Sequence, residues 1–205
     1  MTQDPRADNV RSMSRQDLDD VVGVHLRSFP GFFLSRLGPA FLRHLYRELI
    51  DDPTGIVLIS KHNHSIQGFV AGSTESRGLY RRLLVRKWPL FAISSVAPAI
   101  RHPSLVPRLL NAFYKTDEET FEKGCGLLMS IAVDPQCQSK GIGTRLVHRF
   151  LAECRNRGLS SVRLTTDKTD NDPTNRFYIG LGFTVSKVNT TRQGRVMNEF
   201  RINVV

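Results

Sequence analysis

A short glycine-containing loop has the residue types that bind a phosphate anion through the backbone. The loop reads Gln138-Ser139-Lys140-Gly141-Ile142-Gly143, and it lies between an apolar stretch and a helical pattern. Glycine has no Cβ, so the backbone can turn tightly and approach a ligand closely. The first N–H groups of a helix lack intrahelical acceptors, and the helix dipole makes that end positive. The sequence therefore predicts a pyrophosphate site, with Lys140 adding a positive charge near its rim.

The same residues exclude two other kinds of phosphate loop. A Walker loop ends in Gly-Lys-Ser/Thr, and this loop contains no such ending. A dinucleotide fingerprint carries a third glycine, which is also missing here. The loop alone is a weak signal, so the segments on either side of it carry the argument further.

Those flanking segments resemble one protein family. Upstream stands Ile131-Ala132-Val133-Asp134-Pro135, an apolar strand ending in Val-x-Pro. Downstream stands Asn171–Phe183, which contains an Asn, then Phe-Tyr, then Leu-Gly-Phe. With the Gln-x-x-Gly-x-Gly loop between them, these motifs resemble the GNAT superfamily of acyl-CoA-dependent N-acyltransferases. The resemblance is strong over residues 126–188, weak toward residue 12, and absent over residues 76–120.

The resemblance implies both a fold and a cosubstrate. The expected fold is mixed α+β, with a mostly antiparallel central sheet flanked by helices. A parallel pair of strands, ending at Val133 and Thr166, is expected to splay apart and hold coenzyme A. Acetyl-CoA is the expected cosubstrate and no metal is expected, although Gln138 stands where the family more often has Arg. By position, the coenzyme contacts would be Ile131, Ala132, Val133, Gln138, Ser139, Lys140, Gly141, Ile142, Gly143, Thr144 and Asn171.

Acyl transfer to an amine requires proton transfer near the thioester. A lysine-like amine of pKa about 10.4 must lose a proton before attack, which costs about 4.6 kcal/mol at pH 7. The resemblance places the Tyr178 hydroxyl near the thioester sulfur, as candidate general acid for the leaving thiolate. Glu75 is a candidate base and Ser130 a candidate for ordering a water molecule. The backbone N–H of Ala132 or Val133 is a candidate oxyanion donor.

Each candidate side chain also has a structural interpretation. Tyr178 could be a packing residue beside Phe177, and Glu75 a surface carboxylate. Asp134 precedes a proline and is interpreted as a turn residue. His25 either faces the acceptor site from the first helix or is simply exposed, so the sequence names no base.

The hydrophobic pattern predicts the elements that must position these residues. In the first half, apolar residues at helical spacing predict two helices, and apolar runs flanking a polar turn predict a hairpin. In the second half, a strand, a helix and a strand are followed by a short helix and two paired strands. The predicted helices are Asp17–Phe29, about Pro39–Ile50, Gly143–Arg157 and Pro173–Ile179. The predicted strands are Gly55–Ser60, Ile66–Thr74 (with Lys61–Ser65 as the turn), Gly126–Val133, Ser161–Thr166, Phe183–Val188 and about Arg195–Ile202.

The chain is expected to form one domain. Residues 1–11 are polar and predict a flexible leader, and residues 12–205 form the acyltransferase domain with a helical insert at about 76–120. The segment Arg81–Trp88 in this insert is both basic and apolar. It is either an amphipathic helix that contacts an anionic membrane or an acidic partner, or a helical subdomain with a solvated basic face. No nucleic-acid partner is expected, because no recognised binding motif is present.

The composition is that of a soluble globular protein. Hydrophobic residues make up 40% and charged residues 23%, with a formal net charge of +10. This positive charge either attracts phosphate groups or mainly keeps the protein soluble. The cysteines, Cys125, Cys137 and Cys154, are odd in number without paired spacing, which argues against a disulfide scaffold or a zinc site. We therefore expect a cytoplasmic protein, in which His62 and His64 are solvated loop residues.

Three hypotheses from different classes follow. The first is an N-acetyltransferase that moves an acetyl group from acetyl-CoA to a primary amine. Its acceptor is expected to be a small molecule such as an amino sugar, because the basic insert could bind a phosphorylated acceptor, and a protein or peptide amine is the alternative. The second is a non-catalytic acyl-CoA-binding regulatory module, and the third a nucleic-acid or membrane-surface binder acting through residues 77–87. Both a monomer and a homodimer remain open.

Overall fold

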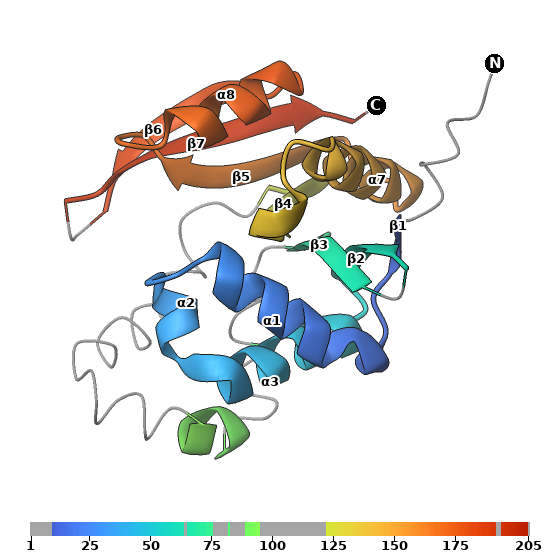
Figure 1. Ribbon diagram of the computed structural model, residues 1–205. Coiled ribbons are helices and arrows are strands. Elements are labelled where there is room, and N and C mark those ends of the chain that lie inside the picture. The colour runs from blue at the N-terminus through green and yellow to red at the C-terminus, as the bar shows by residue number, and fades with distance from the viewer. Residues whose placement is uncertain are drawn as a thin grey trace.

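The computed structural model describes residues 10–63, 65–75, 82, 89–94, 122–191 and 194–204. In this part of the chain, seven strands form one sheet in the order β1-β2-β3-β4-β5-β7-β6, with helices on both faces (Figure 1). The strands are β1 (Val10–Ser12), β2 (Gly55–His62), β3 (Ser65–Ser73), β4 (Cys125–Val133), β5 (Ser161–Asp167), β6 (Thr184–Thr190) and β7 (Val196–Asn203). The α-helices are α1 (Leu18–Ser28), α2 (Phe33–Arg36), α3 (Gly38–Asp51), α7 (Ile142–Asn156) and α8 (Asp172–Gly180). Short 3-10 turns cover Arg15–Asp17 and Pro135–Cys137.

The sheet contains one parallel pair, and that pair separates along its length. Strands β4 and β5 pair only from Cys125–Leu127 against Ser161–Arg163, whereas all other neighbouring strands are antiparallel. Beyond this point β4 contains a bulge. Ala71 of β3 pairs with Ser130 and Gly72 pairs with Leu128, so Met129 has no partner in β3. A bulge bends its strand and increases the local twist, which accounts for the separation. The predicted mixed fold and its splayed strands are thus confirmed.

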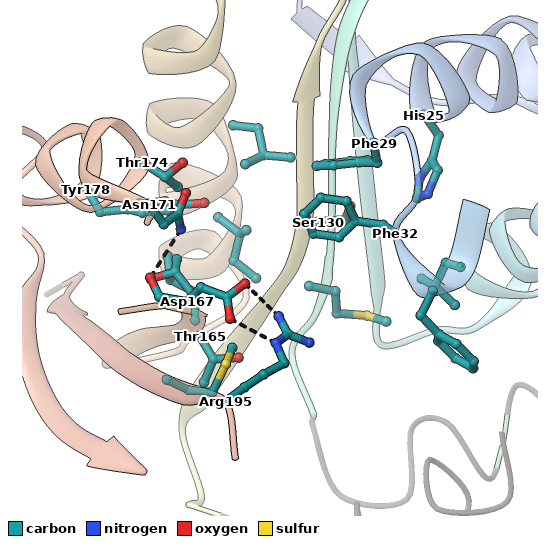
Figure 2. A pocket seen from close by; sticks show the side chains of 18 residues that line it. His25, Phe29, Phe32, Ser130, Thr165, Asp167, Asn171, Thr174, Tyr178 and Arg195 are labelled. Atoms are coloured by element: carbon teal, nitrogen blue, oxygen red, sulfur yellow. Dashed lines mark hydrogen bonds and ion pairs between the residues drawn. The ribbon is translucent and has the colours of Figure 1, made fainter. Parts of the chain in front are cut away.

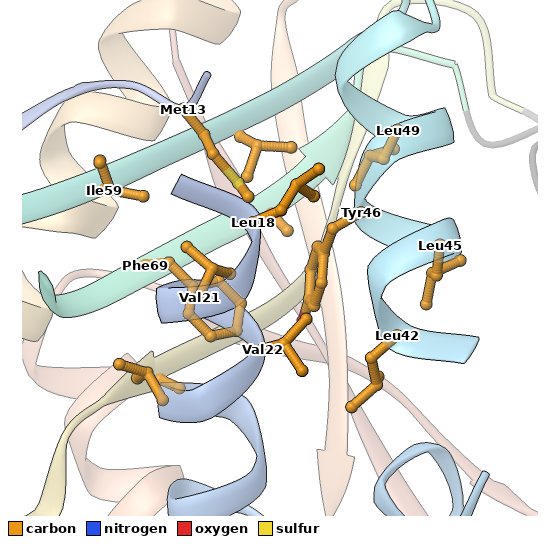
Figure 3. Close-up of a cluster of buried hydrophobic side chains, with 14 of the residues drawn as sticks. Met13, Leu18, Val21, Val22, Leu42, Leu45, Tyr46, Leu49, Ile59 and Phe69 are labelled. Atoms are coloured by element: carbon orange, nitrogen blue, oxygen red, sulfur yellow. The ribbon is translucent and has the colours of Figure 1, made fainter. Parts of the chain in front are cut away.

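Helices α1 and α3 cover one face of the sheet. Their predicted apolar stripes are buried, with Val21 and Leu42 fully inaccessible to solvent, and they pack on Ile59 and Phe69 (Figure 3). Strand β2 supplies both faces, because successive side chains point to opposite sides. Val57 and Ile59 face α1 and α3, whereas Ile56 and Leu58 face the other helices.

Helices α7 and α8 pack on the opposite face, and a glycine allows α7 to come close. The predicted stripe of α7 is buried, with Phe150 fully inaccessible at its centre. A Cβ on Gly72 of β3 would lie 2.3 Å from the Leu127 carbonyl oxygen and 2.5 Å from Phe150 Cζ. No side chain fits at those distances, so Gly72 is required for the packing of α7 on β3.

The first strand lies partly in the segment predicted to be a leader. Val10 and Arg11 belong to β1, which pairs with Ser60 and Ile59 of β2. The Arg11 guanidinium also makes a bidentate ion pair, at 2.7 and 2.8 Å, with the buried carboxylate of Asp17. This pair holds the pKa of Asp17 well below its usual range. A short polar edge strand has no apolar alternation, so the sequence pattern does not reveal it.

The hairpin turn is tighter than predicted. Lys61 and His62 continue β2 and pair with Ile66 and Ser65, so the turn is shorter than the predicted five residues. His64 lies outside the described residues. His62 lies in a strand rather than a loop, and it is exposed as expected.

Most of the predicted insert, residues 76–120, lies outside the described residues. Of the basic segment Arg81–Trp88 only Arg82 is described, and it donates to the Thr54 hydroxyl and the Glu75 carbonyl. Residues 89–94 are helical, and Phe91 packs on Phe41 of α3 with ring centroids 5.1 Å apart. None of the described helices is long and apolar enough to cross a membrane.

Candidate active site

Two adjoining cavities lie along the gap between β4 and β5. The first, here called the loop cavity, has a volume of about 560 Å³ and lies between the end of β4, the loop before α7, and α8. The second, here called the aromatic cavity, has a volume of about 360 Å³ and extends from the same gap to α1, α2 and the start of β7 (Figure 2). Ile131, Thr174 and Tyr178 line both cavities, so the two meet at these residues.

The loop cavity is lined by most of the residues predicted to contact coenzyme. Two predicted residues are absent from its wall: Lys140 is exposed on the loop, and Asn171 lines the aromatic cavity instead. The Asn171 side chain donates to the Asp167 carbonyl at 3.2 Å. The predicted residues in the wall are Ile131, Ala132, Val133, Gln138, Ser139, Gly141, Ile142, Gly143 and Thr144. The sequence analysis missed Pro173, Thr174 and Phe177, which α8 adds.

The N-terminus of α7 is open to an anion. Gly141 is its N-cap at φ 68°, and among the described residues no side chain caps the first N–H groups. A Cβ on Gly143 would lie 3.3 Å from Phe177 Cζ, so a glycine at this position allows the start of α7 to pack closely against α8. Uncapped N–H groups and the positive end of the dipole favour a bound phosphate.

A cation lies next to this helix end. Arg145 stands in the first turn of α7, where the helix dipole disfavours positive charge. One guanidinium N–H group donates to the Lys140 carbonyl at 3.0 Å, while Nε is buried without a partner among the described residues. A pyrophosphate bound at this helix end would offset the charge of Arg145, which stands beside the loop cavity without lining it. The residues of the loop cavity therefore fit the coenzyme A that the family motifs imply.

The backbone of β4 offers hydrogen-bonding groups to the gap. The Asp134 N–H donates to the Gln67 carbonyl, and hydrogen-bonded pairs alternate along an antiparallel ladder. Ala132, two residues earlier, therefore directs its N–H toward β3. Ile131 and Val133 direct theirs toward the β5 side, where β4 no longer has a partner strand. Of the two predicted oxyanion donors, only Val133 is oriented toward the gap.

Tyr178 lies where the two cavities meet. Its side chain is 4% exposed and packs between Phe177, Phe183 and Phe200, with ring centroids 5.2, 5.5 and 5.8 Å away. Burial raises the pKa of the Tyr178 phenol above its ordinary value, because the phenolate would be poorly solvated. The hydroxyl thus carries its proton at neutral pH and can act as a proton donor. The aromatic packing fixes the ring, so the structural and catalytic interpretations are compatible.

His25 forms part of the wall of the aromatic cavity. Its side chain is 2% exposed, and Nδ1 lies 2.7 Å from the Tyr46 hydroxyl. Nε2 is buried and has no partner among the described residues. Burial lowers the pKa of His25 to about 4, so the imidazole is neutral at physiological pH. The sequence left open whether His25 faces the acceptor site or is simply exposed. The structure supports the first, because the imidazole is buried and lines the aromatic cavity.

The two remaining candidates, Ser130 and Glu75, lie at different positions along the sheet. Ser130 lines the aromatic cavity. Glu75 lines neither cavity, because it follows Ser73, which pairs with Leu127 at the opposite end of β4. Its backbone is bonded to the Ser73 hydroxyl at 2.9 and 3.1 Å. The structure therefore gives no support to Glu75 as the base.

Asp134 is held in place as a structural residue. Its carboxylate accepts from Arg27 of α1 at 2.5 and 3.0 Å and from the Gln136 N–H at 3.0 Å. The turn interpretation of Asp134 agrees with these contacts, which also connect α1 to the end of β4.

Residues 20–183 match the Acetyltransferase (GNAT) family. The chain belongs to this family. Membership implies an acyl-CoA-dependent transferase, in agreement with the motifs around the loop cavity. No protein of curated function has a sequence that matches the chain.

Solved structures share the fold of this GNAT protein at low sequence identity. A protein assigned to the same family from Desulfovibrio desulfuricans is 18% identical with a TM-score of 0.65, covering 96% of this chain and 98% of its own. Ard1 from Thermoplasma volcanium is 19% identical with a TM-score of 0.61, covering 96% and 97%. An aminoglycoside 6'-N-acetyltransferase solved with coenzyme A is 13% identical with a TM-score of 0.62, covering 96% and 97%. At these identities the similarity shows the fold alone.

The sequence analysis of this GNAT protein missed most of the aromatic cavity. Phe29, Phe32 and Phe33 flank the turn Pro30-Gly31, and all three line the cavity. Phenylalanines clustered around a Pro-Gly turn are a readable signal, because turns are usually polar and exposed. The facing residues, Asp167 and Arg195, gave no such signal. Among the described residues, no cluster of His, Cys, Asp and Glu side chains could hold a metal ion.

Proposed function

We propose that this GNAT protein transfers the acetyl group of acetyl-CoA to a primary amine of a small molecule. One observation carries the proposal: the loop cavity, with the uncapped end of α7, opens into a second cavity at Tyr178. A coenzyme held in the first cavity and an amine held in the second would meet at that tyrosine. The family match supports the reaction class, and the size of the second cavity supports a small acceptor.

Acetyl-CoA supplies a thioester carbon that a neutral amine can attack. In the proposed reaction a C–N bond forms, the C–S bond breaks, the amine loses one proton and the sulfur gains one. Tyr178, which is protonated at neutral pH, donates its proton to sulfur, and the proton that the amine releases to the ordered water restores the phenol. The Val133 N–H stabilises the developing oxyanion, and Ser130 orders the water that receives the proton of the amine.

Four finer expectations of the sequence analysis remain proposals. The amino-sugar acceptor was inferred from the basic insert, nearly all of which lies outside the described residues. A protein or peptide amine is the alternative acceptor, and a non-catalytic coenzyme-binding module is the alternative function. A cytoplasmic location is supported by the three free cysteines, two of which are buried.

The cofactor site is tested with two isosteric substitutions at Gly141. This residue has φ 68°, a left-handed conformation that Asn and Asp tolerate better than other side chains do. The change Gly141→Asp places a carboxylate beside the pyrophosphate and within reach of Arg145, since the Cβ position lies 3.3 Å from its guanidinium. Gly141→Asn has nearly the same shape without the charge and serves as the control.

Calorimetric titration with acetyl-CoA gives the readout. We expect Gly141→Asp to weaken binding at least about tenfold relative to Gly141→Asn, because like charges repel at close range. Release of free CoA thiol with a panel of amines then tests catalysis. Equal affinity in the two variants, or no acetyl-CoA binding by the folded wild-type protein, would contradict the proposal.

A further inference from the structure

The aromatic cavity has two chemically different walls. One wall comes from the α1–α2 turn, where Phe29 and Phe32 have ring centroids 5.3 Å apart and Phe29 packs on His25 at 4.9 Å. The other wall comes from the end of β5 and the start of β7, with Asp167 and Arg195 facing the gap (Figure 2). Apolar side chains of β4, β5 and β7 also line the cavity (Leu128, Met129, Ile131, Leu164 and Met197), as do the hydroxyl-bearing residues Ser130, Thr165, Thr166 and Thr174.

The charged groups of the second wall are already bonded to each other. Arg195 makes a bidentate ion pair with Asp167 at 2.6 and 2.9 Å, so their charges cancel. Asn171 donates to the Asp167 carbonyl, and the Thr166 hydroxyl donates to the Asn175 side chain at 2.7 Å. A polycationic ligand needs unpaired carboxylates, and Asp167, the one carboxylate among the described residues that line this cavity, is already paired.

The first wall exposes an aromatic ring at the rim of the cavity. Phe32 is 55% exposed, and every other described phenylalanine is buried or partly buried. Phe32 packs on Phe29, and Phe33 lines the same cavity, so the exposed ring belongs to an aromatic cluster. The Phe32 N–H donates to the Phe29 carbonyl at 3.3 Å, so the backbone turn holds the two rings on the same side. The exposed ring is therefore a preformed contact surface at the cavity entrance.

We propose that the acceptor is a hydrophobic primary monoamine, with an aromatic or other apolar body that lies against Phe29 and Phe32. This inference rests on the proposed acetyl transfer and names the substrate class of the same site. It also accounts for the lack of a base. Because the Asp167–Arg195 pair carries no net charge, an amine held against the aromatic wall gains no counter-ion, which disfavours the ammonium form and lowers the pKa of the bound amine. His25 adds no charge to this wall, because its buried imidazole is neutral.

The test compares three amines and three variants of the full chain. With acetyl-CoA saturating, we measure kcat/KM for 2-phenylethylamine, glucosamine and spermidine. Phe32→Ala removes the exposed ring, and Phe32→Leu restores an apolar side chain without the aromatic face. Val188→Ala is the control, because Val188 is 46% exposed on β6 and lines neither cavity.

The expected result is a preference for 2-phenylethylamine of at least about 100-fold over both hydrophilic amines. Phe32→Ala should raise its KM about tenfold and leave the KM for acetyl-CoA unchanged, with Phe32→Leu intermediate. Preference for glucosamine or spermidine, or no effect of Phe32→Ala, would overturn the inference. So would faster transfer from octanoyl-CoA to a hydrophilic amine, because the cavity would then hold the acyl chain.

Direct binding separates this inference from the proposed function. Calorimetry of 2-phenylethylamine against the protein saturated with CoA needs no catalysis. If the amine binds and Phe32→Ala weakens binding, the substrate class stands even where turnover is absent, and the transfer reaction is what fails. If hydrophilic amines are acetylated and 2-phenylethylamine does not bind, the transfer reaction stands and the substrate class is wrong.

Discussion

Acidification should destabilise the protein through His25. The imidazole is 2% exposed between α1 and α3, with Nδ1 bonded to the Tyr46 hydroxyl and Nε2 unpaired among the described residues. Its pKa is about 4 in the native protein and about 6.5 in an unfolded chain, because burial opposes the charged form. Between these two values the unfolded state binds more protons than the native state. Stability is therefore highest above pH 6.5 and falls as the pH decreases toward 4.

The size of the effect follows from the two pKa values. Each pKa unit corresponds to about 1.4 kcal/mol, so the full difference is about 3 kcal/mol. Linkage gives a loss of about 2 kcal/mol between pH 7 and pH 5 from this residue alone. That loss is a large part of the 5–15 kcal/mol by which a typical domain is stable.

Urea unfolding at pH 7 and pH 5 measures this loss, followed by far-UV circular dichroism. In His25→Gln the dependence on pH should shrink by about 2 kcal/mol. Any loss of the bond to Tyr46 is the same at both pH values and cancels from the comparison. His148→Gln is the matched control, since that histidine is exposed on α7 and should leave the wild-type dependence intact. Equal losses in wild type and His25→Gln would refute a neutral buried imidazole.

Two further substitutions test the packing and the catalytic assignment. Gly72→Ala should cost about 3 kcal/mol and lower Tm by about 10 °C, because its methyl group would lie 2.3 Å from the Leu127 carbonyl oxygen. Thermal unfolding measures this, and Gly180→Ala, with nothing within 4 Å, is the control. Tyr178→Phe should lower kcat at least about 100-fold with little change in acetyl-CoA affinity, as read by single-turnover kinetics and calorimetry. An unchanged kcat would leave Tyr178 a packing residue, and an unchanged Tm would refute the close approach at Gly72.

The loop cavity was predictable because its determinants are local. The residues from Gln138 to Thr144 are consecutive, and a strand, a glycine turn and a helix start are each encoded within a few positions. The helical stripes of α1, α3 and α7 were predicted for the same reason, since their period is set by the helix itself. Backbone N–H groups at a helix start point to one place whatever the rest of the chain does.

The aromatic cavity is formed only by the tertiary structure. Its walls combine the Phe29–Phe32 turn with Asp167 and Arg195, segments separated by more than a hundred residues, and no local pattern specifies that they meet. Glu75 lies away from both cavities for a related reason. Its position along the sheet depends on the antiparallel direction of β3 against β4, which a strand pattern does not encode.

The charge states of the site were also decided by packing. An exposed imidazole is about half protonated near pH 6.5. Burial lowers the pKa of His25 to about 4, so this imidazole is neutral at that pH. Likewise, the Asp167 carboxylate is neutralised because β7 brings Arg195 to within 2.6 Å. Sequence determined the strand, glycine turn and helix start at which we predict a phosphate site, since these are properties of a continuous backbone segment. The environment of the aromatic cavity depended on which distant surfaces fold together and exclude water.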